Sequence, residues 1–222
     1  MDFQNIWNTT LNILTGAGTT ISLFLVTILL SLPLGFCFTL IARSKIGPVR
    51  WVMNGIIYIV RGTPLLLQLL FVYFGLPYLP LIGDFLRMER FTASCVTFVV
   101  NYACYFAEIF RGGLLAVNKG QYEAAKVLGM SKVQTMMRVI CPQMVRVALP
   151  SIGNEAVTLV KDTALVFTIG VTEILHLTKT AVSRDKNTFF FVIAAVIYLV
   201  MNTVLTYAFK KVEAKINYEK EG

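Results

Sequence analysis

Long apolar runs dominate the pattern of hydrophobic and polar positions along this chain of 222 residues. A helix that crosses a membrane needs about 20 mainly apolar residues, because the hydrocarbon layer is about 30 Å thick and a helix rises about 1.5 Å per residue. Five runs reach this length, at about residues 19–42, 63–82, 91–110, 151–174 and 189–209. The pattern therefore predicts an all-α membrane protein with five transmembrane helices. The second run has room for a helical lead-in from Trp51, and the fourth is the least apolar.

Composition supports this prediction and indicates one domain. Hydrophobic residues make up 56% of the chain and charged residues only 14%, whereas soluble domains carry about 25% charged residues. The formal net charge of +8 would suit a nucleic-acid-binding protein. However, the basic residues stand in short loops between apolar runs, as in the cytoplasmic loops of membrane proteins. We therefore exclude nucleic acid as a partner and expect a single transmembrane domain over residues 1–222.

The basic residues also predict which side of the membrane each loop faces. One side holds Arg43, Lys45, Arg50, Arg61, Arg111, Lys119, Lys126, Lys132, Arg138, Arg146, Lys210, Lys211, Lys215 and Lys220, which are 14 residues. The other holds the 5 residues Arg87, Arg90, Lys179, Arg184 and Lys186. Because basic loops stay in the cytoplasm, the first side is predicted to be cytoplasmic. The N-terminus is then outside and the C-terminus inside.

The longest polar stretch, about residues 112–150, lies between the third and fourth runs and is predicted to be helical rather than disordered. Residues 121–128 are good helix formers. They end at Gly129, which suits the left-handed turn at a helix terminus. We therefore expect a short helix followed by a glycine break beneath the membrane.

A second helix is expected after this break. Ser131 can cap it, and it is predicted to continue to about Val139. Pro142 and Pro150 are predicted to mark its exit, because proline disrupts the interior of a helix.

The chain offers no sign of metal or nucleotide chemistry. Its four cysteines lie in apolar segments or in the predicted cytoplasmic loop, without metal-ligand spacing, and it has one histidine. A phosphate-binding loop of the form Gly-x-x-x-x-Gly-Lys-Ser/Thr does not occur. We therefore expect no catalytic site, no metal and no cofactor held by this chain.

One segment of the predicted cytoplasmic loop reads Glu-Ala-Ala-Lys-Val-Leu-Gly over residues 123–129, with Ile140 and Pro142 behind it. This segment resembles the EAA motif of bacterial ABC importer permeases. The resemblance implies a coupling helix that docks on the ATP-hydrolysing subunit. Two alanines would present a thin face, the glycine permits a sharp turn, and the glutamate complements the helix dipole. The implied coupling residues are Glu123, Ala124, Ala125, Leu128 and Gly129.

Four further motifs resemble those of polar-amino-acid permeases, in the same order. They occupy residues 61–65, 107–113, 119–125 and 159–163. With the first motif they cover a core of about residues 17–209. The resemblance implies the type I ABC importer permease fold in a bacterial inner membrane.

The same resemblance implies a set of partners and a mechanism. Two permease chains, identical or different, would join two ATPase subunits that hold ATP and Mg. An extracytoplasmic binding protein would deliver the amino acid. ATP binding would drive alternating access through the coupling helix.

Polar residues at helical spacing form stripes on two of the predicted spans. Asn101, Tyr105 and Glu108 share a face of the third, and Ser151, Asn154, Glu155, Thr158 and Asp162 share a face of the fourth. Ionisable groups at membrane depth cost at least about 2.5 kcal/mol each, so they face a bundle interior or a water-filled path. We interpret both stripes as lining the translocation path. The alternative is that they form hydrogen bonds between helices at a subunit interface.

Several other candidates for the path or gate can also be explained by a purely structural role. Thr63 and Pro64 suit the start of a helix as well as a gate. Arg61 and Arg111 suit interfacial anchors, and Glu108 can pair with Arg111 one turn away. The candidate residues for the path or gate are Arg61, Thr63, Pro64, Gln68, Asn101, Tyr105, Glu108, Asn154, Glu155, Thr158, Lys161 and Asp162.

Two other classes of membrane protein fit the sequence less well. An ion-driven secondary transporter would usually show more spans and inverted repeats, and neither is visible. A membrane-embedded enzyme would need a catalytic set such as paired histidines, which a single histidine does not allow. An ATP-driven amino-acid permease is therefore the favoured function.

Overall fold

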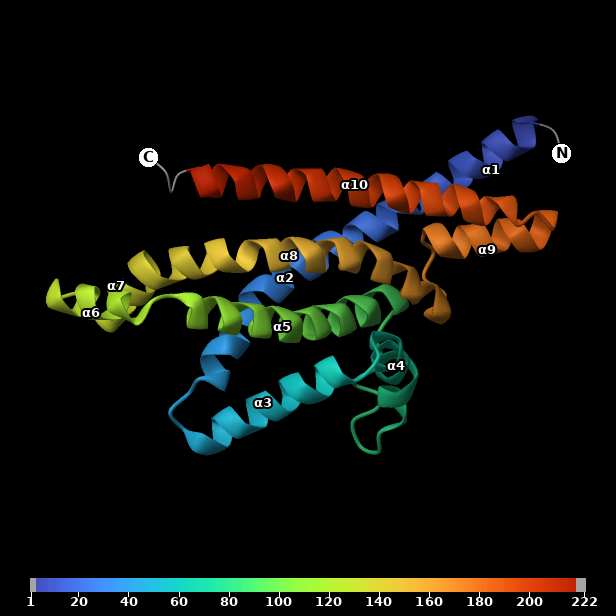
Figure 1. Ribbon diagram of the computed structural model, residues 1–222. Coiled ribbons are helices and arrows are strands. Elements are labelled where there is room, and N and C mark those ends of the chain that lie inside the picture. The colour runs from blue at the N-terminus through green and yellow to red at the C-terminus, as the bar shows by residue number, and fades with distance from the viewer. Residues whose placement is uncertain (1–2, 219–222) are drawn as a thin grey trace.

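The computed structural model describes residues 3–218, and no strand occurs in this part of the chain. Figure 1 shows a bundle of long helices that run roughly side by side. The elements are α1 (Phe3–Thr15), α2 (Ala17–Ala42), α3 (Gly47–Gly62), α4 (Leu65–Leu70), a π-turn (Phe71–Gly75), a 3-10 turn (Leu76–Tyr78), α5 (Arg90–Ala116), α6 (Lys119–Val127), α7 (Lys132–Thr135), a π-turn (Met136–Ile140), α8 (Cys141–Asp162), a 3-10 turn (Thr163–Ile169), α9 (Ile174–Asp185) and α10 (Phe189–Tyr218). The all-α prediction is confirmed. Lys220 of the charge count lies outside the described residues.

Length and apolar composition identify the helices that can cross a membrane. Within residues 3–218, three helices qualify: Gln4–Ala42, Arg90–Ala116 and Phe189–Ile216. The pair Gly47–Gly62 and Leu65–Tyr78 qualifies as a fourth if the two count together. The fourth apolar run of the sequence falls on the second half of α8 and the 3-10 turn behind it. That segment is too polar to qualify alone, but α8 packs between α5 and α10.

The second predicted span, residues 63–82, is not one straight helix. The chain turns by 106° between α3 and α4, and Thr63 at the bend is extended, with φ −117° and ψ 146°. The residue before a proline is disfavoured in helical conformation, so Pro64 accounts for the break. The helical lead-in before the bend is α3, which begins at Gly47 rather than at Trp51.

The glycine break in the polar loop is confirmed. Gly129 has φ +72°, and the N–H groups of Gly129 and Met130 donate to the carbonyls of Lys126 and Ala125. This is the double bond pattern that closes a helix at a left-handed residue. Ser131 then caps α7 with a reciprocal capping box through Gln134.

The predicted exit at Pro142 and Pro150 is wrong. Helical backbone continues from Lys132 through the π-turn and α8 to Ile169. Pro142 lies directly behind the π-turn, so its missing N–H falls where the hydrogen-bond pattern of the helix changes. Pro150 lies inside α8. The polar loop is therefore shorter than residues 112–150, because α5 continues to Ala116 and α8 begins at Cys141.

The core is centred on α5, which Figure 1 shows between α8 and α3. Phe98 and Phe106 of α5 are fully buried. Against them packs α2, which approaches closely at Gly35, where a Cβ would lie 2.8 Å from the carbonyl oxygen of Ala103. Near this contact the Thr39 hydroxyl donates to the carbonyl of Ala107 at 2.9 Å. The α2–α5 pair thus forms a rigid framework behind α8.

Two helices, α1 and α9, were not predicted from the sequence. Glu173 begins α9 by accepting hydrogen bonds from the backbone N–H groups of Leu175 and His176 at 2.7 Å each. The Tyr198 hydroxyl of α10 also donates to it at 2.8 Å. At the other end of α9, Arg184 donates to the Thr9 hydroxyl at 3.0 Å and so fastens α1.

Candidate functional site

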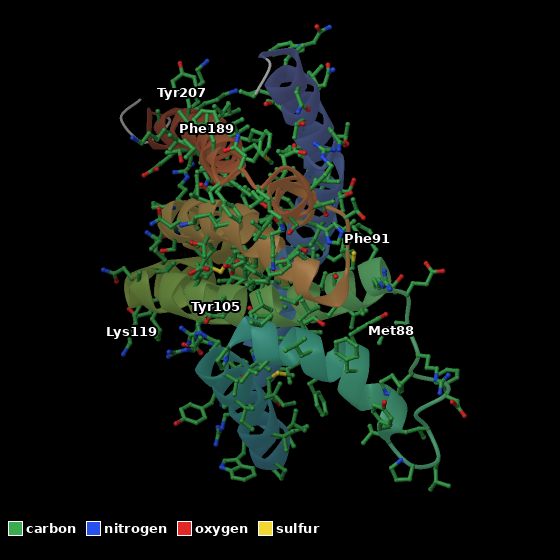
Figure 2. All side chains as sticks on the ribbon, turned by 90° about the vertical axis from the view of Figure 1, so that its right-hand side faces the viewer. Met88, Phe91, Tyr105, Lys119, Phe189 and Tyr207 are labelled. Carbon is green, nitrogen blue, oxygen red and sulfur yellow. The ribbon has the colours of Figure 1, made fainter. Side chains whose placement is uncertain are left out.

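A cavity of about 440 Å³ lies between the bend before α4, the middle of α5 and the end of α8. Its lining is Thr63, Pro64, Leu65, Leu66, Asn101, Tyr102, Tyr105, Glu155, Thr158, Asp162 and Leu165. Figure 2, which looks along the bundle, places Tyr105 on the side of α5 that faces α3 and α4. Segments far apart in the sequence therefore build one polar recess inside the bundle.

Seven of the twelve predicted path or gate residues line this cavity. They are Thr63, Pro64, Asn101, Tyr105, Glu155, Thr158 and Asp162. The predicted stripe on α5 and part of the stripe on α8 therefore face each other.

Hydrogen bonds of Gln68 stabilise the cavity wall at the bend between α3 and α4. The carbonyl of Val60 would normally accept from the N–H of residue 64, but Pro64 has none. The Gln68 amide nitrogen donates to this carbonyl instead, at 2.7 Å, and to the Thr63 hydroxyl at 2.8 Å. The Gln68 amide oxygen in turn accepts from Asn101 of α5 at 2.9 Å. Gln68 does not line the cavity; it fixes the sharp bend against α5.

An ion cluster lies beside Tyr105. Glu108 accepts two-pronged hydrogen bonds from Arg111, with Nη2 to Oε2 at 2.5 Å. Arg61 approaches the same carboxylate at 3.7 Å, and its guanidinium stacks 5.2 Å above the Tyr105 ring. The expected Glu108–Arg111 pair is confirmed. The charge count placed both arginines in loops, but Arg61 lies in α3 and Arg111 in α5.

The stripe predicted on α8 divides between two recesses. Asn154 and Lys161 line a second hollow of about 360 Å³ between α8 and α10, where Phe209 and Lys210 form the opposite side. Thr158 borders both recesses. Lys161 and Asp162 face different hollows because adjacent positions on a helix point in different directions.

Sequence reasoning missed Tyr102, whose hydroxyl donates to Asp162 at 2.8 Å. It also missed Leu65, Leu66 and Leu165, which complete the lining. Tyr102 follows Asn101 directly and stands off the polar stripe, so no signal in the sequence marks it. Its role depends on the approach of α8, which only the tertiary structure supplies.

The predicted coupling segment projects from one end of the bundle as α6 and α7 (Figure 1). Glu123, Ala124, Leu128 and Gly129 are exposed. The expectation that both alanines present a thin face is wrong, because Ala125 is buried where α6 packs on the π-turn before α8.

Apolar side chains that the sequence reasoning did not single out surround the exposed coupling residues. Val127, Val133 and Met137 are exposed beside Leu128. These four apolar residues in an otherwise polar stretch are the signal that could have identified this surface. Among residues 3–218, no group of three His, Cys, Asp or Glu side chains could hold a metal ion.

The chain is similar to known transport proteins over most of its length. Residues 31–218 match the family described as binding-protein-dependent transport system inner membrane component. The chain is 36% identical over 205 residues to the arginine transport system permease protein ArtQ of Bacillus subtilis, covering 92% of each chain. It is 34% identical over 171 residues to the glutamine transport system permease protein GlnP of Escherichia coli K12, covering 75% of this chain and 77% of that one.

A solved structure agrees with these similarities. The chain superposes with a TM-score of 0.86 on a crystal structure of an amino acid ABC transporter with histidines. The two chains are 32% identical, and the match covers 97% of this chain and 99% of the other.

Proposed function

This chain belongs to the family of binding-protein-dependent transport system inner membrane components, and we propose that the cavity between α4, α5 and α8 is where its substrate crosses the membrane. The chain is the permease component of an ABC importer for amino acids, a transport subunit rather than an enzyme. It is a multi-pass protein of the inner membrane, and ATPase and substrate-binding partners come with its family.

The charge of the cavity supports a cationic substrate. Glu155 and Asp162 line the cavity, and its lining includes no lysine or arginine. A zwitterionic amino acid brings one positive and one negative group, so two carboxylates favour an additional positive charge on the side chain. Arginine transport by the relative ArtQ agrees with this choice. Uptake of cationic amino acids is the proposed activity.

Helical continuity supports the proposed coupling. One uninterrupted helical backbone runs from Lys132, beside the exposed apolar surface of α6 and α7, to Asp162 in the cavity wall. Because α6 packs on the π-turn of this helical run, a displacement imposed at α6 would pass directly to the segment that carries Glu155 and Asp162. We therefore place the ATPase subunit on Glu123, Ala124, Leu128 and Gly129, in the cytoplasm. ATP and Mg would be held by that subunit, and this chain would need no cofactor.

One chain does not close the cavity on all sides, and this predicts further partners. One chain with three or four apolar spanning helices does not enclose a path, so we propose that a second permease chain closes it. An extracytoplasmic amino-acid-binding protein would deliver substrate at the membrane face opposite the coupling segment. The two carboxylates would then be exposed alternately to the two faces.

Transport in reconstituted vesicles tests this proposal. The chain is purified with its ATPase subunit and incorporated into vesicles with ATP inside and the binding protein outside. Uptake of labelled arginine should be competed by unlabelled cationic amino acids and little by acidic ones. Competition by acidic amino acids equal to that by arginine would contradict the assignment of a cationic substrate. Failure of the ATPase subunit to co-purify would contradict the proposed coupling surface.

A further inference from the structure

The loop that joins α4 to α5 exposes an unusual set of side chains. Three of its apolar residues are almost completely accessible: Tyr78 at 87%, Leu81 at 104% and Phe85 at 91%. Contiguous exposed apolar side chains in a folded protein mark a surface that contacts another molecule or a membrane. We call residues 78–85 the apolar loop.

Backbone hydrogen bonds hold the apolar loop in tight turns, and these turns keep its apolar side chains exposed. The N–H of Gly83 donates to the carbonyl of Leu79 at 2.9 Å, and that of Leu86 to Ile82 at 3.2 Å. Gly83 is buried, and a Cβ there would lie 2.2 Å from the carbonyl oxygen of Pro77. Leu81 has φ +74°, a left-handed conformation that costs a non-glycine residue about 1–2 kcal/mol. The turns therefore hold the apolar side chains outward at an energetic cost.

The exposed surface of the loop continues an apolar face of the membrane-spanning segment. Leu67, Phe71 and Phe74 of α4 and its π-turn are exposed, and with Tyr78 they recur at spacings of four and three. Residues at these spacings share one face of a helix. An apolar face of this kind on a membrane-spanning segment is suited to contact with lipid. The apolar loop therefore continues an apolar face that lipid can cover.

The position of the loop agrees with contact at the membrane. Figure 1 shows that it extends sideways from α4, away from α5, and stays short of the far end of α9 along the direction of the long helices. Figure 2 shows the loop at the edge of the bundle, returning toward it at Met88. The loop thus lies beside the helices rather than above them.

The polar groups of the loop suit the boundary between lipid and water. Asp84 and Arg87 form an ion pair at 3.2 Å, which lowers the cost of placing either charge near the membrane. Tyrosine is enriched at this boundary because its ring is apolar and its hydroxyl polar, and arginine can extend toward lipid phosphates. Arg87 also lines a hollow of about 340 Å³ with Tyr73, Phe74 and Tyr78.

We propose that the apolar loop is a membrane anchor: Tyr78, Leu81 and Phe85 insert into the lipid interface at the membrane face opposite the coupling segment. The anchor holds α4 from its outer end. Because Thr63, Pro64 and Leu65 at the other end of α4 line the substrate cavity, the anchor fixes one wall while α8 moves with the coupling segment.

Tryptophan fluorescence tests this anchor. Trp7 and Trp51 are replaced by Phe, and Phe85→Trp is introduced into the full-length chain in phosphatidylethanolamine and phosphatidylglycerol vesicles. A second set of vesicles includes lipids brominated near the headgroup end of the acyl chains. Bromine should quench the Phe85→Trp emission at least about twofold, as expected for an aromatic ring at the lipid interface. Val127→Trp is the matched control, because Val127 is also 87% exposed but lies on α6; bromine should not quench it.

Two results would overturn the anchor. Quenching of Phe85→Trp by aqueous iodide but not by brominated lipid would place the loop in water. Quenching by neither would show that protein, such as a second copy of this chain, covers it. If Phe85→Trp fails to assemble, Leu81→Trp gives the same measurement with the same two outcomes.

Discussion

The hydroxyl of Tyr102 donates a 2.8 Å hydrogen bond to Oδ2 of Asp162 and thereby joins α5 to α8 across the cavity wall. Glu155, seven residues earlier on α8, lines the same cavity but has no hydrogen-bond donor among residues 3–218. The two carboxylates therefore differ in their surroundings. Asp162 accepts a hydrogen bond from the protein, whereas Glu155 lines the cavity without one.

This difference predicts different effects of neutralising each carboxylate. Asp162→Asn should depress uptake of every substrate by about tenfold, because a hydrogen bond to a charged group contributes about 1.5–3 kcal/mol. Glu155→Gln should reduce uptake of cationic amino acids more than that of neutral ones. The measurement is uptake of several labelled amino acids, normalised to the amount of assembled complex in the membrane.

Tyr102→Phe is the matched control for Asp162. It removes the donor but keeps the carboxylate and the ring, so uptake should fall for all substrates by less than in Asp162→Asn. If both carboxylate variants transport like the parent, the polar stripe is only packing between helices, and the cavity is not the substrate path.

Gly129→Asp should uncouple ATP hydrolysis from transport. Nothing lies within 4 Å of a Cβ at Gly129, so the cost comes from the left-handed backbone and from a new charge at the docking surface. Gly129→Asn separates the two, because asparagine adopts the left-handed conformation more readily and carries no charge. Stimulation of ATPase activity by loaded binding protein in liposomes should be lost in the Asp variant and largely kept in the Asn variant. Unchanged stimulation and uptake in Gly129→Asp would show that this segment does not couple the subunits.

The predicted topology can be measured by cysteine labelling. In a background without the four native cysteines, a membrane-impermeant maleimide added outside intact cells should label Asp84→Cys and leave Lys132→Cys unlabelled. The reason is the excess of basic residues on the side that includes α6 and α7. Labelling of Lys132→Cys but not Asp84→Cys would reverse the orientation and contradict the proposed site of the ATPase subunit.

Gly35→Ala should destabilise the α2–α5 pair. The added Cβ would lie 2.8 Å from both the carbonyl oxygen of Ala103 and the Cβ of Phe106, so the two helices must move apart. Overpacking of this kind costs about 1–3 kcal/mol. Gly55→Ala on α3 is the control, because nothing lies within 4 Å of its added Cβ. Thermal unfolding of the purified chain should show a lower midpoint for the first variant only, and equal midpoints would contradict the close packing at Gly35.

The sequence by itself determined what depends on local patterns. Apolar runs predicted a helical membrane protein because spanning a bilayer imposes a minimum length on each run. The end of α6 at Gly129 and the cap at Ser131 were also predictable, since both need only residues within one turn. Helical spacing correctly placed Asn101 and Tyr105 on one face of α5.

Only the tertiary structure decided what depends on distant segments. Pro64 predicts a break, but the 106° bend is held by Gln68 and by Asn101 from another helix. Spacing alone put Asn154 with Glu155, whereas α10 and α5 on opposite sides of α8 separate them into two recesses. Periodicity defines the faces of a helix, but it does not determine which neighbour covers each face, because that depends on packing between residues far apart in the chain.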